Sequence, residues 1–137
     1  MAIIIDIPCS PFSYMYYTHI AAPITDGHHK LIRWGMVTHA AIDGFSRLVV
    51  YMKCSNNNRA ATVHVYDLFL EATQNYGLPS RIRCDQGGEN VNVARHMLYH
   101  CGEERRSVLV GSLVHNQRIE RLWRDMHRCV TSTFYRL

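Results

Sequence analysis

The sequence predicts a single α/β domain in which a mixed sheet carries helices on both faces. The 137 residues are enough for one hydrophobic core, and 47% of them are hydrophobic, as in an ordinary globular protein. A β-hairpin pattern opens the regular part of the chain. Beyond the hairpin, segments with strand character alternate with segments of helical periodicity, an order typical of a mixed sheet.

The N-terminal segment has an atypical composition. It is aromatic, almost uncharged and interrupted by Pro11 and Pro23. We expect one strand near residues 15–25, which Asp26 would end. The segment carries Asp6 and lacks a basic stretch, so it is not typical of a signal peptide. No apolar run reaches membrane-spanning length, and we expect no membrane association.

Residues 35–53 predict a β-hairpin. The segments 35–43 and 47–53 are apolar and compatible with strands, and the residues GFS between them form a tight turn. A helix is predicted over residues 59–77, where Gly77 and the following Pro79 end it. Its apolar positions recur with helical spacing at 61, 65, 68, 69 and 72.

The second half of the chain continues the alternation. A short strand over residues 80–84 runs into Asp85, and a helix follows from Asn90 to His100. Another strand is predicted over residues 106–111, and the last helix begins near Asn116. One face of that helix carries apolar residues at positions 119, 122, 123, 126, 130, 134 and 137.

Cysteine and arginine usage indicate the compartment and the partner. The five cysteines are odd in number and form no CxxC pair, which favours reduced thiols in an intracellular compartment. The formal net charge is +4, and all the basic residues except Lys30 and Lys53 are arginine. The planar guanidinium matches phosphate, so this bias favours a phosphate-bearing partner, although a solvated basic surface explains the composition equally well.

Three carboxylates are positioned to meet at one edge of the predicted sheet. Asp26 and Asp85 end two strands, and Glu120 lies on the first turns of the last helix. Gly87 and Gly88 permit positive φ and leave space beside Asp85. An oxygen-only pocket of this kind suits Mg²⁺ or Mn²⁺. On spacing alone, a structural turn at Asp85 and an ion pair between Glu120 and Arg124 remain the stronger interpretations.

Four ordered blocks resemble a known family. The blocks are TDGHHKLIRWG, AIDGFSR, YGLPSRIRCDQGGEN and HNQRIERLWRD. Together they are similar to the catalytic core of retroviral-type integrases and DDE transposases, and most of all to the integrase-core-domain proteins of eukaryotic genomes. The resemblance covers residues 25–137 and leaves 1–24 as an atypical N-terminal segment. It implies an RNase H-like fold with a mixed sheet of five strands.

The resemblance also implies a catalytic triad. The family's two aspartates fall on Asp26 and Asp85, and its glutamate, four residues after Asn116, falls on Glu120. These residues would hold two Mg²⁺ or Mn²⁺ ions for DNA strand cleavage and strand transfer, Asp26 and Asp85 at one ion and Asp26 and Glu120 at the other. Asp43 falls on a turn residue of the family that binds no metal.

DNA is the partner that the resemblance implies. Arginines crowd the last helix, and such an excess can contact phosphates. The predicted DNA-binding residues are Asn116, Arg118, Arg121, Arg124 and Arg128. In the alternative interpretation one or two of these arginines pair with Asp125. The resemblance further implies a homo-oligomer in the nucleus.

A rival hypothesis is a domesticated, non-catalytic module derived from a transposable element, which binds nucleic acid or protein. The intact triad argues against it, and the departures from the family argue for it. AAPIT precedes Asp26 where the family has a different strand. The helical spacing of His96, His100 and Cys101 would suit a metal, but we interpret it as structural.

Overall fold

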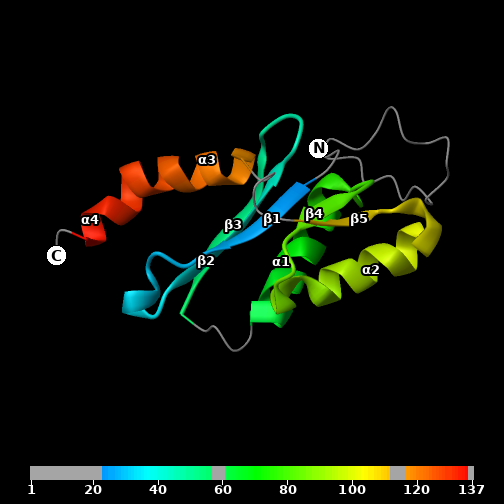
Figure 1. The fold of residues 1–137 in the computed structure, drawn as a ribbon, viewed down its shortest axis with the longest axis horizontal. Helices are drawn as coiled ribbons and strands as arrows, with labels where there is room; N and C mark the ends of the chain where they lie inside the picture. Colours follow the sequence, from blue (N-terminus) through cyan, green and yellow to red (C-terminus); the bar gives the residue numbers. More distant parts are fainter. Residues whose placement is uncertain (1–22, 57–60, 112–116, 136–137) are drawn as a thin grey trace.

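The computed structural model describes residues 23–56, 61–111 and 117–135 (Figure 1). The strands are β1 (Pro23–His28), β2 (Val37–Asp43), β3 (Val49–Ser55), β4 (Ile82–Cys84) and β5 (Val108–Val110). The helices are α1 (Ala61–Tyr76), α2 (Val91–Cys101), α3 (Gln117–Met126) and α4 (Ser132–Phe134). Short 3-10 turns occur at Ile32–Trp34, Gly88–Asn90 and Glu103–Arg105, and a π-helical turn at His127–Thr131 joins α3 to α4.

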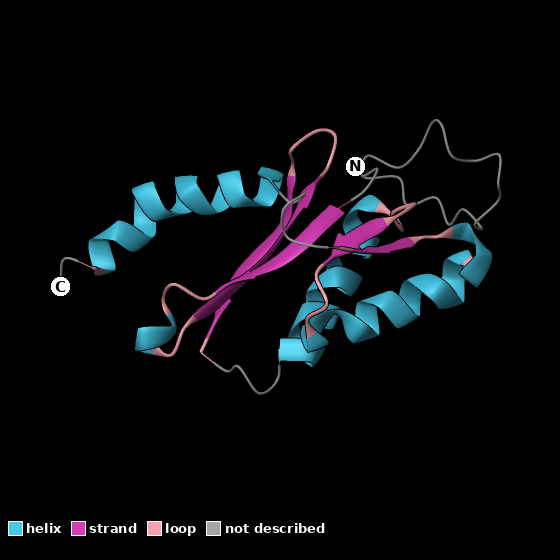
Figure 2. Cartoon of the chain, viewed as in Figure 1, coloured by secondary structure: helices cyan, strands magenta, loops and turns pink. Residues whose placement is uncertain are grey.

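The five strands form one mixed sheet in the order β3-β2-β1-β4-β5 (Figure 2). Strands β1, β2 and β3 are antiparallel neighbours, whereas β4 runs parallel to both β1 and β5. The predicted α/β class, the five-stranded mixed sheet and the hairpin are therefore confirmed. The central strand β1 is the only one of the five that pairs antiparallel on one side and parallel on the other.

The position of the first strand corrects the sequence prediction. The strand begins at Pro23 and runs to His28, so Asp26 lies within it and does not end it. The part of the expected strand before residue 23 lies outside the described residues. Pro23 is tolerated because it is the first residue of the strand, where a missing N–H costs least. As a result Asp26 occupies the centre of the sheet, opposite Ala40 of β2.

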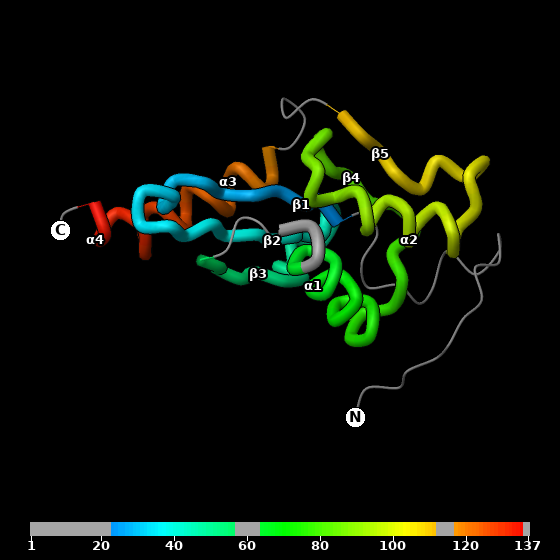
Figure 3. The backbone as a smooth tube through the Cα atoms, turned by 90° about the horizontal axis from the view of Figure 1, so that it is seen from below, coloured from blue at the N-terminus to red at the C-terminus, as the bar shows by residue number. Residues whose placement is uncertain are grey.

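Helices cover both faces of the sheet, and each face has its own core (Figure 3). On one face, α1 and α2 contribute to a cluster of Val65, Phe69, Ile82, Val93 and Met97. On the other face, α3 packs against β1 and β2 in a cluster of Ile24, Ala40, Ile42, Ile119 and Trp123. Successive residues of a strand point to opposite faces, so neighbours along β1 serve different layers.

The buried face of the last helix shifts at the π-helical turn, although the sequence predicted one continuous apolar face. Ile119 and Trp123 are buried as predicted, but Val130 is 50% exposed and Thr131 is 1% exposed. The cause is the π-helical turn over His127–Thr131, which inserts one residue and rotates the following side chains. Nδ1 of His127 and Oγ1 of Thr131 lie 2.7 Å apart in a hydrogen bond across this turn.

The other elements lie within two residues of their predicted bounds. Helix α1 is described from Ala61, since the predicted start at residue 59 lies outside the described residues, and it ends at Tyr76, one residue earlier than predicted. The short strands β4 and β5 each begin two residues later than expected. Helix α2 is preceded by a 3-10 turn and ends at Cys101, where Gly102 donates its backbone N–H to the carbonyl of Leu98.

Burial on the α3 face gives a direct stability test. Ile119→Ala should reduce the free energy of unfolding by about 2–4 kcal/mol, because it empties a fully buried site in the core. Val130→Ala should change it by less than about 0.5 kcal/mol, because the π-helical turn leaves Val130 exposed. Urea denaturation of both variants measures the difference. Equal losses would show that the helix continues without the change of phase.

Candidate functional site

Asp26 and Asp85 come together because β1 and β4 are parallel neighbours. Ile24 pairs with Arg83, Asp26 lies two residues further along β1, and Asp85 directly follows the last residue of β4. The pKa of Asp26 is raised, first by burial, and the negative charges of Asp85 and Glu89 raise it further. These carboxylates therefore lie close enough to repel one another, which is the arrangement that cation sites require.

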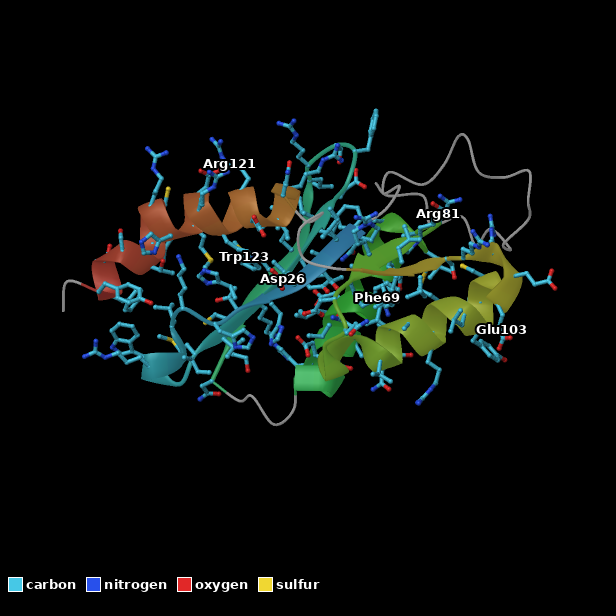
Figure 4. All side chains as sticks on the ribbon, in the orientation of Figure 1. Asp26, Phe69, Arg81, Glu103, Arg121 and Trp123 are labelled. Carbon is cyan, nitrogen blue, oxygen red and sulfur yellow. The ribbon has the colours of Figure 1, made fainter. Side chains whose placement is uncertain are left out.

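Two hydrogen bonds hold the Asp26 carboxylate. Oδ1 accepts the backbone N–H of Gly27 at 2.8 Å, and Oδ2 accepts Nε1–H of Trp123 at 2.9 Å. Both bonds oppose the rise in the pKa of Asp26 because they favour the charged form. Figure 4 shows Trp123 reaching from α3 towards Asp26 on β1. Residues 97 positions apart in the sequence thus share one contact.

A polar chain connects Asp85 to the central strand. Oδ1 of Asp85 accepts the backbone N–H of Gly87 at 3.0 Å and Nδ2–H of Asn90 at 2.9 Å. Oδ1 of the buried Asn90 accepts the hydroxyl of Thr25 at 3.0 Å. Thr25 neighbours Asp26, so the turn after β4 is tied to the residue beside the other carboxylate. Oδ2 of Asp85 has no hydrogen-bond partner among the described residues.

Gly87 and Gly88 do not adopt the positive φ angles that the sequence analysis allowed for. The φ angle of Gly87 is −63°, and Gly88 is not among the described glycines with positive φ. A Cβ added to Gly87 would lie 2.5 Å from Oε2 of Glu89. A side chain at position 87 would therefore displace the Glu89 carboxylate, which folds back against the Gly87 backbone. The predicted space beside the chain is present, and the Glu89 side chain of the same turn occupies it.

Glu120 lies apart from the two aspartates. It is exposed on the first turn of α3, and its charge is not among those that shift the pKa of Asp26. Over the described parts of the chain, no three His, Cys, Asp or Glu side chains are close enough to hold one metal ion. The structure therefore brings Asp26 and Asp85 together without Glu120, and the three-carboxylate pocket stays a prediction. Nδ1 of His96 lies 3.1 Å from the Tyr66 hydroxyl, and its ring meets the edge of Phe69, so His96 joins α2 to α1.

Asp43 belongs to a turn, as expected. Its side chain is fully buried, and Oδ2 accepts the backbone N–H of Ser46 at 2.7 Å and the Ser46 hydroxyl at 2.6 Å. Arg47, which follows in this turn, has a φ of 65°. These contacts close the hairpin between β2 and β3.

The arginines of the last helix are exposed. Arg118, Arg121 and Arg124 lie on α3, and Arg128 lies on the π-helical turn. Figure 4 shows Arg121 pointing away from the sheet. Asn116 lies outside the described residues.

One of these arginines forms the alternative pairing. Nε of Arg121 lies 3.2 Å from Oδ2 of Asp125 in an exposed ion pair. The other alternative, a pair between Glu120 and Arg124, is absent although the structure describes both residues. An exposed ion pair contributes little to stability, so it leaves the guanidinium available to other partners.

Sequence reasoning assigned no site role to three residues around the carboxylates. Glu89 and His39 line a small hollow together with Asp26, and Trp123 was expected only as a core residue. The pKa of His39 is lowered, first by burial, and the charge of Glu89 opposes that shift. The pairing of β1 with β2 places His39 opposite Gly27, next to Asp26, and no sequence pattern indicated this register.

Comparisons with known proteins agree with the fold. The family model described as integrase core domain matches residues 19–137. No curated protein matches the chain.

One solved structure is similar over most of the chain, with a TM-score of 0.61 and 17% identity. It is the simian T-cell lymphotropic virus intasome in complex with PP2A regulatory subunit B56 gamma, determined by cryo-EM. The match covers 88% of this chain and 46% of the viral chain, so this chain spans about half the length of that relative. At this identity the likeness shows the fold. No helix in the described ranges is long and apolar enough to cross a membrane.

The raised pKa of Asp26 predicts a pH effect on stability. Ionising Asp26 costs folding free energy above its raised pKa, and the cost disappears as the pH falls below it. Asp85→Asn removes a repelling charge, while its carboxamide oxygen can still accept both hydrogen bonds. Without metal, this variant should exceed wild type in stability at neutral pH by up to about 1 kcal/mol.

The advantage of Asp85→Asn should shrink as the pH falls through the pKa of Asp26. Melting curves in a chelator between about pH 8 and pH 4 measure it. Asp67→Asn, on the exposed face of α1, is the matched control and should show no such trend. A variant less stable than wild type at neutral pH would contradict the repulsion.

Proposed function

The chain belongs to the integrase core domain family, and from this premise we propose that it is a DDE-type catalytic core that cleaves and joins DNA strands with divalent metal. One observation supports the proposal above all others. Asp26 lies within β1, Asp85 directly follows the neighbouring parallel strand β4, and the charge of Asp85 helps to raise the pKa of Asp26 in the absence of a cation. A protein does not gain stability from such a pair, so a ligand is the simplest reason for it.

The donor set fits Mg²⁺ or Mn²⁺. Both aspartates offer carboxylate oxygens, which hard divalent ions prefer. Oδ2 of Asp85 is free of hydrogen bonds from described residues, and each oxygen of Asp26 accepts one hydrogen bond and so keeps a second lone pair. When bound, the ions would neutralise charge on the scissile phosphate and activate the attacking hydroxyl or water.

Each of the candidate residues would have its own role in this reaction. Asp26 and Asp85 hold the reacting phosphate region at the sheet through the shared cation site. Glu120 completes the site from the first turn of α3, which requires its exposed side chain to turn towards Asp26. Arg118, Arg121, Arg124 and Arg128 provide positive charge for the DNA backbone from the solvent side of the same helix. We further propose that the core self-associates and acts in the nucleus.

A second candidate function rests on Glu120. Its exposure and its distance from the aspartate pair suit a domesticated module that binds nucleic acid through the arginines and performs no chemistry. The two functions share the DNA surface and differ only in metal dependence. Metal binding therefore discriminates between them.

The metal site can be tested by thermal stability. Saturating Mn²⁺ should stabilise the wild-type protein by about 2.7 kcal/mol at a concentration one hundred times the Kd. Asp85→Asn should lose this stabilisation and the metal-dependent cleavage of labelled DNA, because it removes a charged ligand. The control Asp67→Asn should retain both. A wild-type protein that binds DNA but shows no shift with millimolar Mn²⁺ would exclude the enzyme and favour the binding module.

The DNA surface can be tested separately. Arg121→Ala combined with Arg124→Ala should weaken DNA binding and reduce its salt dependence by about one unit of slope for each lost phosphate contact. Metal-induced stabilisation should persist, because Asp26 and Asp85 are unchanged. Arg81→Ala with Arg95→Ala is the matched control, since both residues are exposed and the change in net charge is the same. If both double variants weaken binding equally, the surface on α3 has no special role.

A further inference from the structure

Trp123 packs in the hydrophobic core and also donates a hydrogen bond to a carboxylate. Its ring is 7% exposed and packs with Ile24, Ala40, Ile42 and Ile119. Its Nε1–H nevertheless points at a carboxylate and donates to Oδ2 of Asp26 at 2.9 Å (Figure 4). An indole has a single donor, so this direction fixes both the ring and the carboxylate that accepts from it.

The indole is also held from its other side. The imidazole of His28 stacks on it with ring centroids 4.8 Å apart and an angle of 23° between the planes. His28 follows Asp26 by two residues on β1, so both residues lie on the same face of the strand. The same strand thus supplies the surface that orients the indole and the carboxylate that the indole orients.

Resting on the proposed function, we propose that Trp123 is the positioning residue of the metal site: its Nε1–H holds Asp26 ready for a cation and sets the place of α3 above β1. Hydrogen bonds from outside the ligand shell typically govern metal affinity by 10- to 100-fold. The Gly27 N–H holds Oδ1 of the same carboxylate, and together the two donors leave no free rotation about the side chain.

The contact also links Asp26 to Glu120. Trp123 lies three residues after Glu120 on α3, so the two side chains are neighbours on the helix surface. Because the indole is anchored on Asp26, the position of Glu120 along β1 is fixed as well. Glu120 is exposed, so packing does not restrict its rotamer.

Trp123→Phe is the first test, because it keeps an aromatic ring and removes only the donor and the second ring. The Kd for Mn²⁺, measured by calorimetry in the cold, should rise about tenfold or more. Trp34→Phe is the matched control, since Trp34 is the other tryptophan of the chain and packs edge-on against Phe134 and Tyr135. It should leave the Kd unchanged. Melting curves without metal report the packing loss separately.

A second measurement uses the unmodified protein. The two tryptophans should produce two indole N–H signals in a ¹H–¹⁵N spectrum. On titration with Mg²⁺, the Trp123 signal should shift and saturate, whereas the Trp34 signal should stay in place.

The outcomes separate the two proposals. If wild type binds Mn²⁺ and Trp123→Phe binds it with a Kd within twofold of wild type, the positioning role is wrong and the proposed function stands. The same conclusion follows if Trp123→Phe does not fold and the Trp123 indole signal ignores Mg²⁺ while the Gly87 amide responds. If wild type binds neither ion, the positioning role and the proposed function both fail.

Discussion

The pairing of β1 with two different neighbours is the constraint on which the rest of the structure depends. On one side β1 continues the antiparallel hairpin, and on the other it lies parallel to β4. The parallel side requires a long crossover, which α1 supplies across one face of the sheet. The parallel pairing also brings Asp26 of β1 near Asp85, which follows β4. The candidate site is therefore a direct consequence of sheet topology.

Burying a carboxylate at that position has an energetic cost that the surroundings offset only in part. Burial and the charges of Asp85 and Glu89 raise the pKa of Asp26, whereas the donors from Trp123 and Gly27 lower it. On the opposite face, Asn90 bridges Thr25 and Asp85 and keeps the turn after β4 in place. Each aspartate is thus held by two hydrogen-bond donors, which is the kind of preorganisation that a cation site needs.

The two faces of the sheet have separate roles. Helices α1 and α2 build the larger aliphatic core, and they support the turn that carries Asp85. Helix α3 covers the other face with few apolar residues, two of which, Ile119 and Trp123, are buried. Its outer surface carries the arginines. One helix therefore brings together a packing contact, a hydrogen bond to Asp26 and the positive charge proposed for DNA.

The sequence by itself determined the order of elements and the mixed sheet, because apolar periodicity and glycine positions are local properties, and the resemblance to a known family implied the turn role of Asp43. Its four motif blocks indicated the family. Only the tertiary structure decided that Asp26 lies inside β1, that Glu89 folds against Gly87 and that a π-helical turn exposes Val130. It also decided that Trp123 donates to Asp26. Trp123 and Asp26 lie 97 positions apart in the chain, and the other features are backbone and side-chain conformations that an apolar pattern does not encode.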